Sequence, residues 1–494
     1  MPAINAHILS DILITPLLGA VLIAMLPARG RILQWTALAV TTFTLLLTLH
    51  LPFHYCYCMG GFQFVTNHAW IATPAIRYHL GVDQLSLWLV VLAGLLAPPA
   101  VLVSWNAISN RTKEFYILFL VLQTAIFGVF LSLDLILYYG FWELSLVPMA
   151  LLIAVFGRTM HRRRAALKYF LYTFISSAFL LAAIIWLYAK TGTFDYVTLS
   201  QLAQAHAIPA APHALFLASL GFLIAFAVKV PIVPLHGWLA DAISEGPIAA
   251  AMVIAGKLGL YSILRFSFGI FPAQTAHVAP TLVALGAIGI LYGACLALAQ
   301  TDLRRLVAFS IVSHLGFCVV GIFALTQTSL DGGIYQILNH GLSGAALFLL
   351  VGYLYERYSV TDLRDLGGLA KPLPWLATCF VITTLSLIGL PILNGFVGEF
   401  LSLSGAFPVH PRWIVAATFG VVLGAAYMLW TVQRIFYGQP GAAVLHADPA
   451  HDLDVREHLS LWPLLILMLV LGVASPIFMR AIDAASSILL KGVR

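Results

Sequence analysis

Four charged residues and two histidines lie inside long apolar stretches of this sequence, and their types are suited to chemistry. The charged residues are Glu143, Lys229, Lys257 and Glu399, and the histidines are His314 and His340. A charge at the centre of a bilayer costs about 2.5–3.5 kcal/mol, so a residue of this kind indicates function by default. Burial disfavours the charged forms of lysine and glutamate, and histidine titrates near neutral pH. The chemistry that these residues predict is proton transfer within a membrane.

A structural role is the alternative for each of these groups. A Glu–Lys pair can hold helices together, a lysine can extend its amine to the membrane surface, and a membrane histidine can be a hydrogen-bonded packing residue. Here two acids and two lysines lie on separate stretches, and both histidines fall between Lys257 and Glu399. That distribution favours a proton path over helix packing.

Prolines accompany two of the charged residues. Pro231 and Pro234 follow Lys229, and Pro391 precedes Glu399. Proline removes a backbone donor and clashes with the preceding helical turn, so both stretches should be broken helices. Unwound backbone in a membrane is tolerated only where protein shields it or where it lines a polar cavity. Two broken helices with adjacent charges also suggest two related halves, as in transporters built from inverted repeats.

The composition requires a membrane around these residues. Of the 494 residues, 61% are hydrophobic and 9% are charged, against about 45–50% and about 25% in soluble domains. In hydrocarbon only helices and closed barrels satisfy the backbone, and the apolar runs here have the length of about 20 residues that a spanning helix needs. We therefore expect an all-α, polytopic membrane protein.

The apolar runs predict fourteen membrane spans joined by short loops. They cover residues 10–27, 31–52, 82–104, 115–132, 134–157, 166–189, 212–233, 248–270, 279–299, 305–325, 332–355, 373–405, 412–437 and 460–482. The seventh and twelfth spans are the ones broken by proline. We divide the chain into N-terminal helices (1–114), a first repeat (115–270), a second repeat (279–437), and a loop with the last helix (438–494).

The distribution of lysine and arginine predicts the orientation. With both termini outside, sixteen of the 25 basic residues fall in inward loops, seven fall on the outward side, and Lys229 and Lys257 lie within spans. Arg162–Arg164 contributes most to the inward set, and Arg265 was assigned to the outward set. The positive-inside rule therefore predicts periplasmic termini in a bacterial inner membrane.

The remaining residue types suggest few other sites. Cys56 and Cys58 form the only close cysteine pair, and with His54 alone beside them they are too few for a metal site or an iron–sulfur cluster. No nucleotide-binding fingerprint is present, and the basic residues are too dispersed to indicate nucleic acid. His236 follows the first proline break, and the other histidines are expected to be solvated in loops: His54, His68, His79, His446, His451 and His458.

Several motifs, in their order along the chain, resemble those of one family. They are Gly81-Val-Asp-Gln-Leu-Ser-Leu-Trp88, Phe141-Trp-Glu143-Leu-Ser-Leu-Val-Pro148, Lys229-Val-Pro231, Gln300-Thr-Asp-Leu-Arg-Arg305, Ser313-His-Leu-Gly-Phe317, Asn339-His-Gly-Leu-Ser343, Leu366-Gly-Gly-Leu369, Asn394-Gly-Phe-Val-Gly-Glu399-Phe400 and Asp454-Val-Arg-Glu-His458. Together they resemble the antiporter-like subunits of respiratory complex I, the proton-pumping NADH:quinone oxidoreductase, most closely those of M type.

The resemblance implies a fold and a set of roles. It implies fourteen helices with inverted repeats and broken helices 7 and 12, and proton transfer through Glu143, Lys229, Lys257, His314, His340 and Glu399. Glutamate at position 399, where L and N types carry lysine, and the lack of a long C-terminal lateral helix indicate the M type. The implied partners are L-type and N-type neighbours and phospholipids. NADH, FMN, iron–sulfur clusters and quinone would belong to partner subunits, with no cofactor in this chain.

The sequence departs from the family pattern near the seventh and eighth spans. The family's His-Thr-Trp-Leu-Pro-Asp-Ala-His is His236-Gly-Trp-Leu-Ala-Asp241-Ala-Ile243 here, and the stretch from Pro247 to Lys257 is about three residues shorter. Two other functions therefore stay open. One is the homologous subunit of a multisubunit cation/proton antiporter or a membrane-bound hydrogenase, and the other is a structural spacer.

Overall fold

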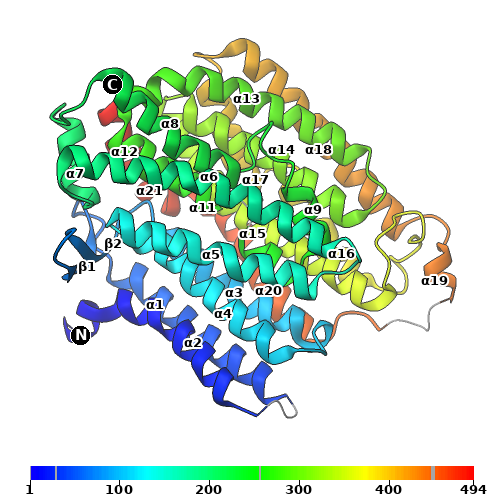
Figure 1. Cartoon of the computed structure of the whole chain (residues 1–494). Coiled ribbons are helices and arrows are strands. Elements are labelled where there is room, and N and C mark those ends of the chain that lie inside the picture. Colours follow the sequence, from blue (N-terminus) through cyan, green and yellow to red (C-terminus); the bar gives the residue numbers. More distant parts are fainter. Residues whose placement is uncertain (1, 28–30, 255–256, 447–450, 494) are drawn as a thin grey trace.

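The computed structural model describes residues 2–27, 31–254, 257–446 and 451–493 and is a bundle of membrane-length helices (Figure 1). Thirteen helices among these residues are long and apolar enough to cross a membrane, and Pro374–Leu387 is a shorter apolar helix. With the interrupted helix that contains Pro374–Leu387, they correspond to the fourteen predicted spans. The prediction of an all-α polytopic membrane fold is confirmed.

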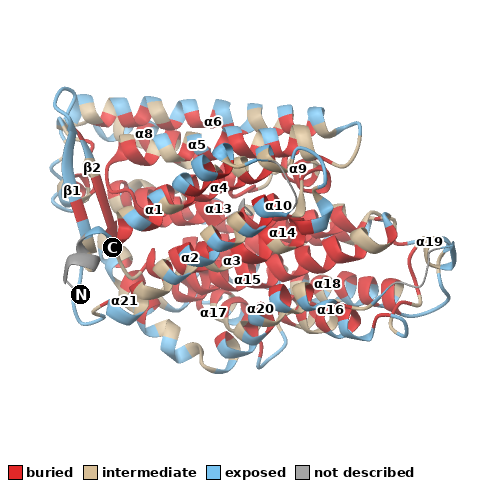
Figure 2. Ribbon diagram, turned by 90° about the horizontal axis from the view of Figure 1, so that it is seen from below, coloured by how far each residue is buried: buried red, intermediate tan, exposed pale blue. Residues whose placement is uncertain are grey.

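The chain opens with three membrane-length helices and one hairpin. Their bounds are α1 Pro2–Met25, α2 Ile32–His54, β1 Gln63–Ile71, β2 Ile76–Val82 and α3 Leu87–Ala107. The hairpin lies within a stretch predicted to be a loop, and its strands pair antiparallel. The bundle therefore has two distinct ends: the hairpin side, which carries the hairpin and both termini, and the opposite side, which carries α19 (Figure 2).

The remaining helices follow in three groups. The first is α4 Thr112–Leu131, α5 Leu135–Phe156, α6 Arg162–Thr191, α7 Tyr196–Gln204, α8 Pro212–Lys229, α9 Leu239–Glu245, α10 Ile248–Ile254, α11 Lys257–Ser262, the π-helical turn η1 Ile263–Ser267 and α12 Phe268–Ile270. The second is α13 Pro272–Leu298, α14 Leu303–Phe323, α15 Gln327–Tyr358, α16 Pro374–Leu387, α17 Asn394–Ala406 and α18 Pro411–Phe436. The last is α19 Ala442–His446, α20 Val455–Val473 and α21 Ser475–Val493.

Both proline-rich stretches are non-helical. Helix α8 ends at Lys229 and α9 begins at Leu239, while α16 ends at Leu387 and α17 begins at Asn394. The freed backbone groups find partners within the protein: the Trp238 indole donates to the Val228 carbonyl at 2.9 Å, and the Asn339 amide donates to the Asn394 carbonyl at 2.8 Å. Such shielding is what non-helical backbone needs at membrane depth. The inverted relation between the two halves stays a prediction.

The centre of the bundle is formed by α14 and α15, whose most apolar stretches are wholly buried. Aspartates fix where several of the central helices begin. Asp134 accepts a hydrogen bond from the Ile136 amide at 2.9 Å, and Asp302 accepts one from the Arg305 amide at 3.0 Å. An aspartate at the N-cap satisfies amides that have no partner within the helix. These caps set the register of the buried helices that carry the candidate site.

The structure corrects three local predictions. Arg265, counted among the basic residues of the outward side, is 3% exposed and belongs to η1 within the bundle. His79, expected to be solvated, is buried on β2, and its Nδ1 lies 2.6 Å from Asp195. The predicted span 460–482 is two helices, because α20 ends at Val473 and the amphipathic α21 follows. The errors at Arg265 and His79 come from reading local hydropathy where a partner distant in sequence decides burial.

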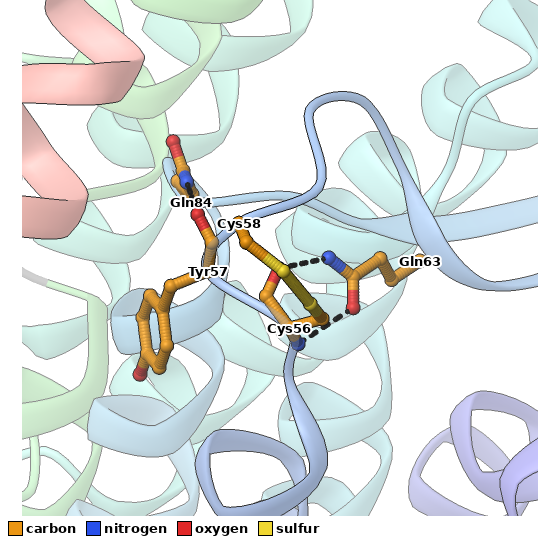
Figure 3. Close-up of a disulfide and its surroundings, with 5 residues drawn as sticks. All are labelled: Cys56, Tyr57, Cys58, Gln63 and Gln84. Atoms are coloured by element: carbon orange, nitrogen blue, oxygen red, sulfur yellow. Dashed lines mark hydrogen bonds between the residues drawn. A yellow bond between two sulfur atoms is a disulfide. The ribbon is translucent and has the colours of Figure 1, made fainter.

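The Cys56–Cys58 pair is a disulfide on the hairpin side (Figure 3). The Gln63 side chain binds both backbone groups of Cys56, accepting from its amide at 2.9 Å and donating to its carbonyl at 2.7 Å. The Gln84 amide donates to the Tyr57 carbonyl at 3.4 Å. These contacts join the end of α2 to the start of the hairpin.

Candidate functional site

Lys229 is the last residue of α8, and its amine is enclosed by α5 and α6. It is 3% exposed, and its Nζ lies 3.3 Å from both the Ser145 hydroxyl and the Tyr169 hydroxyl. The same amine lies 5.4 Å from the centre of the Trp142 ring and 5.5 Å from that of Tyr169. Hydroxyl acceptors and aromatic faces stabilise an ammonium group without neutralising it. The site can therefore hold a proton on Lys229.

Glu143 lies between two of the residues that surround Lys229, on the same turn of α5 as Trp142 and Ser145. Its side chain is half-buried, and its Oε1 has no hydrogen-bond partner among the described residues. The described contacts include no ion pair within 4.0 Å between Glu143 and Lys229, although the two side chains interact electrostatically. Glu143 can therefore influence the charge of Lys229 without being locked to it.

Lys257 is the first residue of α11. Its Nζ donates to the Met252 carbonyl at 3.0 Å, and the side chain is 6% exposed. Ala255 and Gly256, which precede it, lie outside the described residues. The lysine packs against Gly341 of α15, where an added Cβ would lie 2.8 Å from Lys257 Cε. Glycine at 341 therefore allows the lysine to reach α15 beside His340.

Two histidines continue from Lys257 toward the second half of the bundle. The rings of His340 on α15 and His314 on α14 have centroids 5.9 Å apart. His340 Nδ1 is buried without a hydrogen-bond partner among the described residues. His314 Nδ1 lies 3.2 Å from Glu399 Oε1, and its Nε2 lies 3.3 Å from the Tyr427 hydroxyl. A neutral imidazole has one donor and one acceptor nitrogen, so His314 can pass a proton between its neighbours.

Glu399 ends this line on α17, beside the second helix interruption. The carboxylate is 5% exposed and accepts a hydrogen bond from the Gln336 amide at 3.1 Å. Gln336 in turn accepts from Asn339 at 3.2 Å. The Ser386 hydroxyl donates to Asn394 Oδ1 at 2.6 Å. A buried carboxylate needs partners of this kind, because an unpaired charge in a low-dielectric interior is costly.

The structure brings together four of the six predicted site residues: Lys257, His340, His314 and Glu399. Lys229 and Glu143 form a second group, and no hydrogen bond among the described residues joins the two groups. Between them, α8 and α11 are in close contact: a Cβ added at Gly259 would lie 2.6 Å from the Val230 side chain.

Several polar residues of the site were not predicted. Gln336, Asn339 and Ser343 share with His340 the spacing of three and four residues that places side chains on one helical face. That pattern was available in the sequence. The contributions of Tyr169, Tyr427 and Ser145 carried no such signal, because hydroxyls are common in membrane helices and each acts here on a residue of another helix.

A cavity of about 390 Å³ opens at the opposite side of the bundle, at the start of α10. Charged residues from four elements line it: Arg158, Glu245, Arg304 and Glu356. Glu245 accepts from the Thr159 amide at 2.9 Å, and Arg158 Nη2 lies 3.2 Å from Asp302. The cavity is large enough and polar enough to hold water.

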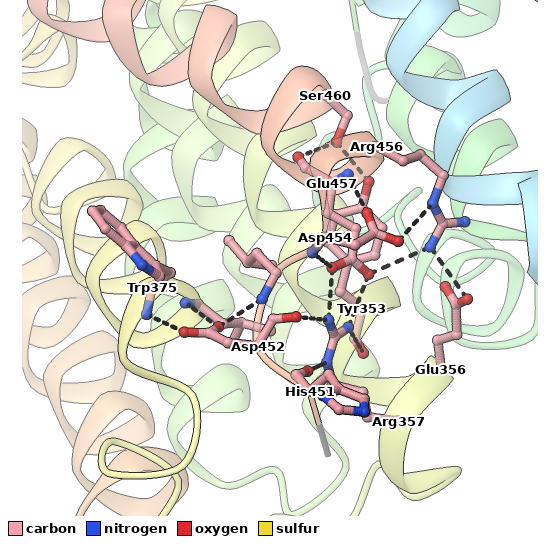
Figure 4. A network of polar contacts seen from close by, with 12 residues as sticks. Tyr353, Glu356, Arg357, Trp375, His451, Asp452, Asp454, Arg456, Glu457 and Ser460 are labelled. Carbon is pink, nitrogen blue, oxygen red and sulfur yellow. Dashed lines mark hydrogen bonds and ion pairs between the residues drawn. The ribbon is translucent and has the colours of Figure 1, made fainter.

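Beside this cavity, a network of ion pairs joins the end of α15 to the start of α20 (Figure 4). Arg357 of α15 pairs with Glu457 of α20 at 2.6 Å, and Arg456 pairs with Glu356 at 3.3 Å. Asp454 and Glu457 form a capping box at the start of α20. The motif Asp454–His458 therefore holds the start of α20 against α15. It makes no described contact with the candidate proton-transfer residues Lys257, His340, His314 and Glu399.

Two family models together match residues 14–424. One, described as "NADH:quinone oxidoreductase/Mrp antiporter, TM", matches residues 132–424. The other, described as "NADH-ubiquinone oxidoreductase chain 4, amino terminus", matches residues 14–133. The chain is also 40% identical to NADH-quinone oxidoreductase subunit M of Pseudomonas aeruginosa over 493 residues, covering 94% of each chain. It is 39% identical to the subunit M of Rhodobacter capsulatus over 485 residues, covering 94% of this chain and 93% of that protein.

A solved structure has the same fold. A chain of the respiratory complex I of Thermus thermophilus with bound NADH superposes with a TM-score of 0.88 at 28% identity. The superposition covers 98% of this chain and 100% of that chain. The similarity therefore extends over nearly the whole chain.

Proposed function

The chain belongs to the family of NADH:quinone oxidoreductase and Mrp antiporter membrane subunits, and we propose that it is a proton-translocating membrane-arm subunit of NADH:quinone oxidoreductase, of M type. The observation that carries this proposal is the buried line from Lys257 through His340 and His314 to Glu399. Each member is ionisable, and each is enclosed by helices that span the membrane. Buried ionisable residues in membrane proteins mark ion pathways and proton relays.

We propose that the second half of the relay works through the histidines. Lys257 delivers its proton toward the unpartnered Nδ1 of His340, and His314 takes it up across the 5.9 Å that separates the two rings. His314 accepts the incoming proton at Nε2, where the Tyr427 hydroxyl can accept a hydrogen bond from it, and releases the proton on Nδ1 to the Glu399 carboxylate. Water bridges the ring gap, because direct transfer needs heavy atoms within hydrogen-bond distance.

The first half is the pair formed by Lys229 and Glu143. In this proposal Lys229 holds a proton, and the charge state of Glu143 decides how tightly it is held. Glu143 is half-buried, so a neighbouring subunit can approach it. A membrane potential of about 150–200 mV makes each transferred charge cost about 3.5–4.6 kcal/mol. Release from Lys229 must therefore be coupled to an event in the partner complex, namely electron transfer to quinone.

We propose that the partners are L-type and N-type membrane-arm neighbours together with phospholipids, and that nucleic acid is not a partner. NADH, FMN, iron–sulfur clusters and quinone belong to partner subunits in this proposal, and this chain contributes no redox centre. Its own chemistry consists of holding and moving protons. The alternative is a subunit of a cation/proton antiporter, since the matching family model includes the Mrp antiporters.

The proposed location is a bacterial inner membrane with both termini in the periplasm. Two observations support this orientation. Two of the counted arginines are buried, Arg265 of the outward set and Arg304 of the inward set, and without them six outward basic residues stand against fifteen inward. The Cys56–Cys58 disulfide lies on the hairpin side, and disulfides persist in oxidising compartments such as the periplasm.

We also propose that residues 115–270 and 279–437 are inverted repeats. Asp134 caps α5 and forms an isolated β-bridge with Asp195, which follows α6. Asp302 caps α14 and forms the same kind of bridge with Asp362, which follows α15. The first bridge lies on the hairpin side and the second on the opposite side. Equivalent caps and bridges at opposite ends are what an inverted repeat produces.

The test is to isolate the protein with its native partners and measure NADH-driven proton uptake in sealed vesicles. We expect quinone-reductase subunits to co-purify, and NADH oxidation to acidify the vesicle interior. Sodium-dependent proton exchange without NADH, together with small antiporter subunits in the preparation, would instead establish the antiporter alternative.

A further inference from the structure

The turn between α9 and α10 is held from two sides by residues outside it. Glu245, the last residue of α9, is 8% exposed, and its carboxylate accepts hydrogen bonds from the amide and the hydroxyl of Thr159 at 2.9 Å. The Glu245 carbonyl accepts from the Arg158 amide at 2.9 Å. From the other side, Arg304 of α14 donates from Nη2 to the Gly246 carbonyl. Two consecutive carbonyls of the turn are therefore fixed, one by the α5–α6 loop and one by α14.

Arg304 is a buried cation whose hydrogen bond among the described residues is the one to Gly246. It is 5% exposed and lines the cavity of about 390 Å³ together with Glu245 and Gly246. The carboxylate of Asp302, two residues earlier, is engaged by Arg158 at 3.2 Å and caps the start of α14. A hydrogen bond with a charged donor is stronger than one between neutral groups. Arg304 therefore ties the turn to α14 through one strong contact, and the proposed relay does not itself use this residue.

Helix α10 connects this turn to the hydrogen bond of Lys257. The helix begins directly after the turn, where the Ala250 amide donates to the Pro247 carbonyl at 3.1 Å. Further along the same helix, the Met252 carbonyl accepts from Lys257 Nζ at 3.0 Å. The backbone between the turn and Met252 is helical and spans only about 1.5 Å per residue, so it moves as one unit. A displacement of the turn therefore displaces the carbonyl that binds the lysine.

We infer that Arg304 is a positioning residue for proton transfer by Lys257. By holding the Gly246 carbonyl, Arg304 fixes α10 and with it the Met252 carbonyl that binds the Lys257 amine. Arg304 lies on α14, the helix that carries His314, so the same contact sets the position of that carbonyl relative to the histidine. A misplacement of about 1 Å in a reacting group can reduce a rate about 100-fold. The inference deepens the proposed function and rests on it, because the position of Lys257 matters only if Lys257 transfers a proton.

The test uses the intact complex, reconstituted in sealed vesicles, and compares two substitutions at Arg304. Arg304→Met keeps a long unbranched side chain but removes every donor, whereas Arg304→Lys keeps a cation that can donate to the Gly246 carbonyl. We expect Arg304→Met to lose NADH-driven proton uptake several-fold and Arg304→Lys to recover most of it. Backbone amide exchange of residues 248–254, measured by mass spectrometry on the same samples, should rise several-fold in Arg304→Met and stay near the wild-type rate in Arg304→Lys.

Arg305→Met is the matched control, because it is the same substitution one residue further along α14. Arg305 is partly exposed and reaches Asp241 of α9 at 3.4 Å. When Arg305 is lost, Asp241 keeps its 2.7 Å contact with Lys168, so α9 stays in place. We expect this variant to match the wild type in both proton uptake and amide exchange.

Thr159→Val tests the other side of the turn. It removes the hydroxyl that binds Glu245 but keeps the backbone amide, so the turn is loosened only in part and the loss of uptake should be smaller. Wild-type uptake in assembled Arg304→Met, or equal losses in the methionine and lysine variants, would overturn the inference. So would an equal loss in Arg305→Met. If Arg304→Met failed to assemble, wild-type uptake by Thr159→Val would overturn the inference in its place.

The proposed function and the role of Arg304 fail in different measurements. NADH-driven uptake by wild-type vesicles is recorded in the same preparation, and its absence would reject the proposed function. Amide exchange of residues 248–254 reports on how firmly Arg304 holds the turn, and it needs no turnover. Unchanged exchange in assembled Arg304→Met would overturn the inference even if wild-type vesicles pump.

Discussion

Gly341→Ala tests whether the position of Lys257, rather than its presence, sustains the relay. The added Cβ would lie 2.8 Å from Lys257 Cε and 2.6 Å from Leu92 Cδ2. Carbon atoms prefer separations of about 3.5–4.0 Å, so the lysine must retreat by about 0.7–1.2 Å. That movement is enough to break its 3.0 Å hydrogen bond to the Met252 carbonyl. The substitution therefore displaces the amine while leaving every ionisable group in the chain.

The expected cost follows from the size of this displacement. A misplacement of about 1 Å in a reacting group can reduce a rate about 100-fold. Overpacking a core usually costs about 1–3 kcal/mol of stability, which an assembled complex of this size can absorb. We therefore expect Gly341→Ala to assemble and to lose most NADH-driven proton uptake, with quinone-reductase turnover falling in parallel.

The assay is the rate of interior acidification per NADH oxidised in reconstituted vesicles, with the subunit content checked on the same sample. Gly344→Ala is the matched control, one turn further along α15, where an added Cβ would lie at an ordinary 3.7 Å from the His340 ring. Adding Leu92→Ala to the Gly341→Ala variant removes the second clash. Wild-type pumping by Gly341→Ala, or recovery of pumping when Leu92 is shortened, would refute the reasoning.

Three further predictions concern charge and orientation. Glu143→Gln keeps the side-chain volume but removes the charge, so we expect the complex to assemble normally and to pump far fewer protons. If instead little complex assembles, and the part that does assemble pumps normally, the chain would be a structural spacer. Three variants each remove one buried charge: Lys229→Ala, Lys257→Ala and Glu399→Ala. We expect each to lower quinone-reductase turnover as well as pumping, whereas Lys190→Ala, on the surface, should leave both nearly unchanged. Unaltered turnover and pumping in all three would contradict the relay. Cysteines placed in the β1–β2 hairpin should react with an impermeant reagent added outside sealed cells, and cysteines in α19 should not; the reverse would contradict the orientation.

The sequence was sufficient to predict the class of the protein and to single out six candidate site residues, whose role stays a prediction, because both steps depend on properties that are local. An apolar run of about 20 residues can only be a membrane helix, and a charge within such a run costs too much to persist without a role. Glu399 and His314 illustrate this. Both were identified from the helix that holds them, although they are 85 residues apart and meet at 3.2 Å only in the folded bundle.

The errors involve residues whose surroundings are built from distant segments. Arg265 lies near the end of an apolar run, as a loop arginine does, and its burial depends on Asp83, which is 182 residues earlier. His79 depends in the same way on Asp195, 116 residues later. Hydropathy within one window carries no information about such partners. The β-hairpin was missed for a related reason, since its strands face outward on one side and lack a long apolar pattern.

The arrangement of the buried groups accounts for how a proton path can avoid being a leak. Continuous hydrogen bonding from one surface to the other would dissipate the gradient, at about 2.3 kcal/mol for each charge and each 100 mV. Among the described residues no hydrogen bond joins the pair of Lys229 and Glu143 to the other four groups, and none joins the two histidines, whose ring centroids lie 5.9 Å apart. In the proposed relay these two gaps are the places where transfer can be started or stopped. The hydrogen bonds of Lys229, Lys257 and Glu399 hold the groups on either side of them in position.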